Sequence, residues 1–192
     1  MMYKELLSAV AITLTFIAFY PYIRSIQKGE TKPHVFSWVI WGSTTFVVFL
    51  AQLADKGGAG AWPIGVSGVI TIYVALLAYI KKSDITITRT DWLFFITAMT
   101  SLPLWYLTSD PLWAVVILTT VDLFGFVPTF RKAYASPFEE KLTFFVLMAV
   151  RNFIVILALA HYSLTTVLFP AITAIACLVF IVMVMHRRRL QK

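Results

Sequence analysis

The chain has 192 residues, of which 60% are hydrophobic and 13% are charged, and its formal net charge is +7. Soluble domains are about half apolar and about a quarter charged, so a soluble domain of this length cannot hide so much apolar surface. The basic residues lie between apolar runs, which argues against a nucleic-acid partner and indicates a protein whose solvent is the lipid bilayer.

Long apolar segments follow one another along the chain. A helix needs about 20 mainly apolar residues to cross a bilayer, because each residue adds about 1.5 Å and the hydrocarbon core is about 30 Å thick. Helices are expected because backbone groups in lipid must be satisfied internally, and the alternation typical of a β-barrel is missing. The sequence predicts an all-α membrane protein with seven transmembrane helices at 5–24, 35–54, 62–81, 92–108, 111–130, 142–161 and 165–186.

The basic residues between these helices predict a topology. Thirteen lie on one side of the seven spans, and two, Lys4 and Lys56, lie on the other. Cytoplasmic loops carry the excess of Lys and Arg. We therefore expect a multi-pass protein integral to a cell membrane, with its N-terminus outside and its C-terminus in the cytoplasm.

A constant offset of 107 positions relates the two halves of the chain, which predicts an internal repeat. The unit is three helices, and the fourth helix restores the same orientation in the second unit. The halves are therefore predicted to be parallel repeats, arranged 3+1+3: a first repeat at 1–85, a linker helix at 86–110 and a second repeat with a basic tail at 111–192. The matched pairs are Phe19 with Phe126, Pro21 with Pro128, Arg24 with Arg131, and Pro63 with Pro170.

This layout and the loop motifs are similar to the SWEET and PQ-loop superfamily of membrane transporters. Phe19-Tyr20-Pro21-Tyr22-Ile23-Arg24 and Phe126-Val127-Pro128-Thr129-Phe130-Arg131 resemble the family's motif at the end of the first helix of each unit, although Tyr22 and Thr129 replace its glutamine. Segments three and seven lack the asparagine that sugar-carrying members usually place there. The resemblance implies that four cytoplasmic prolines act as hinges, namely Pro21, Pro33, Pro128 and Pro137.

These prolines also have a simpler interpretation. A proline inside a helix removes a hydrogen bond and kinks the backbone, so Pro21 and Pro128 could let the cytoplasmic halves swing or could merely help to end their helices. Pro63 and Pro170 are expected in the first turns of their helices, where proline is well tolerated.

Asp122 and Arg151 fall near the middle of neighbouring segments of the second repeat. Ionisable groups at bilayer depth are costly, so we expect the two to pair. Their repeat counterparts are Thr15 and Thr44, which predicts an asymmetric site. Two interpretations stay open: a structural ion pair between segments five and six, or a carboxylate for proton coupling or substrate binding.

Five further residues are candidates for substrate binding. Asn152 is the one asparagine of the chain, and its amide either bonds across helices or lines a site. Trp41 could stack on a substrate, whereas Trp38 could belong only to the interfacial aromatic belt. Ser67 and Thr71 lie four apart on one helix face and either line a pocket or bond to their own helix.

The sequence favours a carrier that moves a small polar solute, such as a sugar or another small metabolite, by alternating access between two three-helix bundles. The alternative is a receptor or sorting protein of the same fold that binds a ligand without transport. An enzyme is not expected, because no catalytic cluster is present, and neither a cofactor nor a metal is expected. The expected partners are a small-molecule substrate, the lipid bilayer and, as a possibility left open, a second copy of the chain.

Overall fold

The structure is a computed structural model that describes residues 2–30, 33, 35–81, 89–135, 137–138 and 142–191, leaving aside the side chains of residues 91, 127–129, 131 and 132. All regular secondary structure in these ranges is helical, with no strand. The elements are α1 (Met2–Gln27), α2 (Val35–Ala54), the short 3₁₀ helix η1 (Gly58–Ala61), α3 (Trp62–Ile80), α4 (Arg89–Thr108), α5 (Pro111–Ala135), α6 (Leu142–Ala158) and α7 (Leu164–Leu190).

Each predicted span coincides with one α helix, which confirms the all-helical fold. Among the described residues, α1, α2, η1 with α3, and α7 are long and apolar enough to cross a membrane. The other three helices contain shorter apolar stretches, at Trp92–Thr108, Pro111–Phe126 and Leu142–Ala158. Large apolar side chains also cover the outside of the bundle; Leu107 is 76% exposed and Val182 67%. Such faces suit lipid and indicate a membrane protein.

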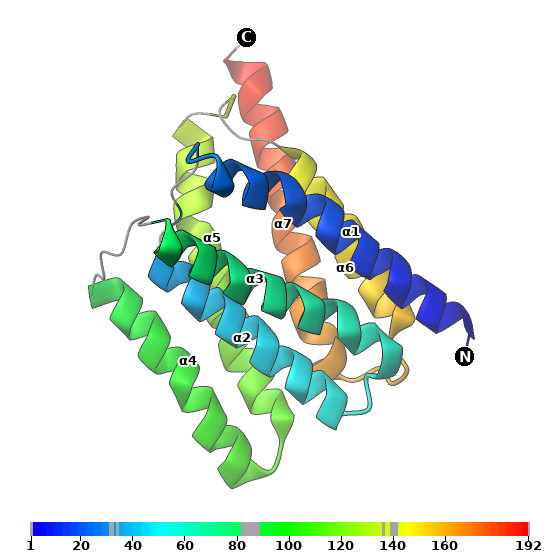
Figure 1. Cartoon of the computed structure of the whole chain (residues 1–192). Helices are drawn as coiled ribbons and strands as arrows, with labels where there is room; N and C mark the ends of the chain where they lie inside the picture. Colours follow the sequence, from blue (N-terminus) through cyan, green and yellow to red (C-terminus); the bar gives the residue numbers. More distant parts are fainter. Residues whose placement is uncertain are drawn as a thin grey trace.

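Apart from α4, each α helix packs mainly against two others, so that the order α1, α3, α2, α5, α7, α6 leads back to α1 (Figure 1). α3 packs between α1 and α2, and α7 packs between α5 and α6. Two further interfaces join these groups: α1 lies against α6, and α2 lies against α5. We call them the α1–α6 seam and the α2–α5 seam. α4 lies at one edge, against α5 and α2.

Small residues explain how closely α2 and α3 approach each other. A Cβ added at Gly42 would lie 2.6 Å from the side chain of Ile72, and one at Gly65 would lie 2.9 Å from the ring of Phe49. Helices in membranes gain stability from such close backbone packing, because lipid gives little hydrophobic drive for association. The first three helices therefore form a tight group.

The start of α7 differs from the sequence expectation. Ser163 caps the helix in a capping box with Thr166, so Pro170 lies in the second turn and not in the first. A proline there has no N–H for the carbonyl four residues earlier, which is that of Thr166. The Gln52 amide nitrogen donates to this carbonyl at 2.7 Å, so a side chain of α2 supplies the missing bond. For Pro63 the expectation is confirmed, since it lies at the beginning of α3.

Candidate functional site

Two hydrogen bonds cross the two seams in matching positions. In the α2–α5 seam the Thr44 hydroxyl donates to the carboxylate of Asp122 at 2.9 Å. In the α1–α6 seam the Arg151 guanidinium donates through Nε to the hydroxyl of Thr15 at 3.2 Å. Thr15 and Asp122 are 107 positions apart, and so are Thr44 and Arg151. Each seam thus joins one threonine of the first half to one ionisable residue of the second half.

The expected ion pair between Asp122 and Arg151 is not formed. No salt bridge joins them within the described residues, and each has other partners. The reason is the packing order: α5 turns Asp122 toward α2, whereas α6 turns Arg151 toward α1. The two charged groups therefore occupy different seams.

Arg151 ties three helices together from a position where only 1% of its surface is exposed. Besides Thr15 on α1, its Nη2 donates to the carbonyl of Pro63 on α3, and its Nη1 donates to the Asn152 side-chain oxygen at 2.8 Å. Asn152 is itself fully buried, and its amide nitrogen donates to the carbonyl of Met148 at 2.9 Å. Asn152 thus bonds within α6 and supports the arginine, and none of its hydrogen bonds among the described residues reaches another helix.

Aromatic rings surround the α2–α5 seam on the side of the α2 start. Trp38 stacks on Tyr22 of α1 with ring centroids 5.0 Å apart, so it has a partner inside the protein and does not only face the membrane interface. Trp41 meets Trp38 edge to face at 5.7 Å. Its indole ring occupies the space that a Cβ at Gly125 would need, one turn after Asp122. Trp41 therefore lies against the turn of α5 that follows Asp122, and Trp38 lies against Trp41.

Ser67 and Thr71 do not join this arrangement. Both are buried, and the Thr71 hydroxyl donates to the Ser67 carbonyl at 2.8 Å, so this hydroxyl bonds to its own helix. The structure brings together Trp38, Trp41 and Asp122 of the predicted residues, and separately Arg151 and Asn152.

The predicted hinge prolines have different surroundings. Pro21 lies inside α1, more than one turn before the helix ends at Gln27. Pro33 is buried just before α2, and Pro137 lies in the turn after α5, where its carbonyl accepts from Arg188 at 3.0 Å. Pro128 belongs to α5, but its ring falls outside the described side chains. Their role as hinges stays a prediction.

Sequence reasoning missed two buried polar groups near the seams. Gln52 is fully buried with one oxygen unpaired, and the Thr119 hydroxyl is also buried without a hydrogen-bond partner within the described part of the chain. The signal for Gln52 was Pro170, because a proline inside a helix frees a carbonyl that another side chain must satisfy.

α2 and α6 end at the same end of the bundle, and α1 begins there, so we call it the N-terminal end. Contacts between the loops that follow α2 and α6 close this end. The amide of Ala160 donates to the Gly57 carbonyl at 2.9 Å, and Lys4 donates to the Leu159 carbonyl at 2.5 Å. Ser163 donates to the Asp55 carboxylate, which also lies 3.6 Å from His161. The loops of the two halves are thereby joined at this end.

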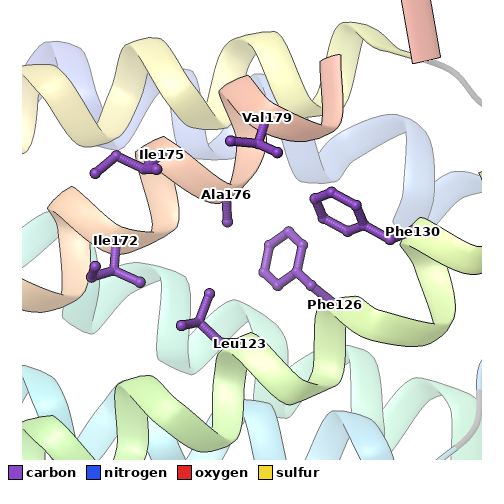
Figure 2. Close-up of a pocket in the computed structure, with 7 residues that line it drawn as sticks. All are labelled: Leu123, Phe126, Phe130, Ile172, Ile175, Ala176 and Val179. Atoms are coloured by element: carbon purple, nitrogen blue, oxygen red, sulfur yellow. The ribbon is translucent and has the colours of Figure 1, made fainter. Parts of the chain in front are cut away.

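An apolar groove of about 440 Å³ lies between α5 and α7 (Figure 2). Carbon atoms line it almost entirely, so it offers no hydrogen bonds to a polar solute. Its lining residues are Leu123, Phe126, Phe130, Ile172, Ile175, Ala176 and Val179.

No group of His, Cys, Asp or Glu side chains that could hold a metal ion occurs within the described ranges. Comparisons with protein-family models, with curated proteins and with solved structures find no match to this chain.

Proposed function

We propose that this protein is a transmembrane carrier for a small polar solute, which crosses by alternating access between two three-helix units, 1–85 and 111–192. The linker helix at 86–110 would connect them, and all seven α helices would span the membrane. The N-terminal end of the bundle would face outside and the basic C-terminal end the cytoplasm.

The observation that carries the proposal is the pair of matched seam bonds, Thr44 with Asp122 and Arg151 with Thr15. Equivalent positions of two repeats make equivalent contacts across both interfaces, which supports an approximate twofold relation. Carriers built from repeats bind their solute near the midplane, where the repeats meet. Ionisable residues at bilayer depth commonly mark substrate or ion pathways.

The packing order supports the same arrangement. α3 between α1 and α2 corresponds to α7 between α5 and α6, and α4 stands apart at the edge. Among the described residues the two groups meet mainly along the two seams, with smaller contacts between α2 and α7 and between η1 and α6. Rocking of two such groups against each other is the movement that alternating access requires.

The test is uptake into proteoliposomes by the wild type and by Asp122→Asn, across sugars, amino acids and vitamin-like solutes, with and without a pH gradient. Asp110→Asn is the matched control, because Asp110 is an exposed acid at the N-terminal end. We expect uptake of at least one solute that Asp122→Asn reduces at least tenfold and Asp110→Asn leaves unchanged. Specific binding without uptake of any solute would contradict the carrier and favour a receptor of the same fold.

A further inference from the structure

Within the described residues, the carboxylate of Asp122 has no positively charged partner. Its one hydrogen bond comes from the neutral hydroxyl of Thr44, and its other oxygen has no partner within the described residues. The residue is partly exposed, and this oxygen is not among the buried polar atoms that lack a partner. An ionised carboxylate at bilayer depth is costly unless a cation or a proton accompanies it.

Arg151 cannot serve as that cation. It lies in the other seam, where three oxygen atoms hold its guanidinium and only 1% of the residue is exposed. The same burial keeps it from meeting an anionic solute. Of the two ionisable groups at this depth, only Asp122 is available to a ligand.

An indole ring lies against α5 one turn after Asp122. It belongs to Trp41, which packs on Gly125. The Thr44 hydroxyl lies 2.9 Å from the Asp122 carboxylate and 3.0 Å from the Trp41 carbonyl, so its one proton is shared between these two acceptors. Trp38 and Tyr22 continue the aromatic surface toward α1. Aromatic faces attract cations, and tryptophan does so most strongly.

We propose that the α2–α5 seam binds an organic cation, a protonated amine with an apolar or aromatic body. The ammonium group would contact the free oxygen of Asp122, and the body would lie against Trp41. This inference rests on the proposed carrier function and specifies its substrate class, because a sugar would not neutralise the carboxylate and a carboxylic acid would be repelled by it.

The test is direct binding to the purified full chain in detergent, measured by isothermal titration calorimetry with three probes of equal shape: 2-phenylethylamine, 2-phenylethanol and phenylacetate. Empty micelles serve as the blank for partitioning. We expect the amine to bind at least tenfold more tightly than the alcohol and phenylacetate not to bind. Asp122→Asn should abolish the preference for the amine, and Asp110→Asn should keep it.

Equal binding of the amine and the alcohol, or a preference for the amine that survives in Asp122→Asn, would overturn the inference. If Asp122→Asn does not fold, Trp41→Leu provides a second test, because it should weaken the binding of the amine more than the binding of the alcohol. An equal loss of affinity for both probes would overturn the inference. Uptake separates the two proposals. Binding of the amine without transport would contradict the proposed carrier function alone. Asp122-dependent uptake of neutral solutes, with no binding of the amine, would leave the carrier function standing and overturn the organic cation as its substrate.

Discussion

Gly60 offers the sharpest test of how the N-terminal end of the bundle closes. A Cβ added there would lie 2.5 Å from the Leu159 nitrogen, 2.7 Å from its Cα and 2.8 Å from the carbonyl carbon of Ala158. All three are backbone atoms, so no side chain can rotate away. Gly60→Ala must therefore move η1 and the end of α6 apart by about 1 Å, since unstrained carbon contacts need about 3.5 Å.

That displacement acts on the contacts between the two halves. The bonds from Lys4 to Leu159 and from Ala160 to Gly57 both cross this interface. Overpacking of this kind costs about 1 to 3 kcal/mol. Under the proposed alternating access, only the arrangement that is closed at this end bears this cost, so the population of the open arrangement should rise by about 5- to 150-fold.

The assay is a distance measurement between spin labels at Met2 and Leu164, which are 84% and 67% exposed at this end. Cys177 is the one native cysteine, so Cys177→Ser provides the background. We expect longer distances in Gly60→Ala and no change in Ala9→Val, which adds bulk at an exposed position of α1. Unchanged distances in a folded, monodisperse Gly60→Ala protein would refute the argument that this contact holds the end closed.

Two further predictions concern stability in detergent. Arg151→Lys keeps the charge but loses the planar guanidinium that reaches Thr15, Asn152 and Pro63, so we expect it to lower the free energy of unfolding by about 1 to 3 kcal/mol. The control Arg189→Lys, at an exposed position, should leave the stability unchanged, and equal melting temperatures of Arg151→Lys and the wild type would contradict the clamping role of Arg151. Gln52→Leu should lower the free energy of unfolding of the wild type by about 0.5 to 1 kcal/mol. The same substitution should have a smaller effect in a Pro170→Ala background, because the new backbone N–H of that variant can donate to the Thr166 carbonyl in place of Gln52. Additive effects of the two substitutions would exclude a coupling between Gln52 and Pro170.

The helices were predictable because each span is a long apolar run, and lipid requires such runs to be helical. Their ends were less predictable, since they depend on local chemistry. α6 ends at Ala158 and α7 begins after Ser163 because of a capping box, and η1 was not predicted at all. The whole set of seven spans and their orientation stay predictions that topology mapping can test.

The partners of Asp122 and Arg151 could not be read from position along the chain. Both lie near the middle of neighbouring segments, which made pairing the simplest solution, but depth alone does not specify which way a helix face turns. The offset of 107 positions carries a further constraint on these contacts. Once Thr44 is known to contact Asp122, a twofold relation predicts that Arg151 contacts Thr15, as it does.

Under the proposed repeat, the two seams of one chain can differ from each other, as they could not in an assembly of two identical units. In identical units both seams would carry the same residues. Here Arg151 lies in one seam and is held by three oxygen atoms, whereas Asp122 in the other seam receives one hydrogen bond from the described residues, and its second oxygen receives none from them. The α1–α6 seam is therefore tied by a buried guanidinium, whereas the α2–α5 seam holds a carboxylate with a single hydrogen bond among the described residues. Under the proposed carrier, only this carboxylate can meet a solute.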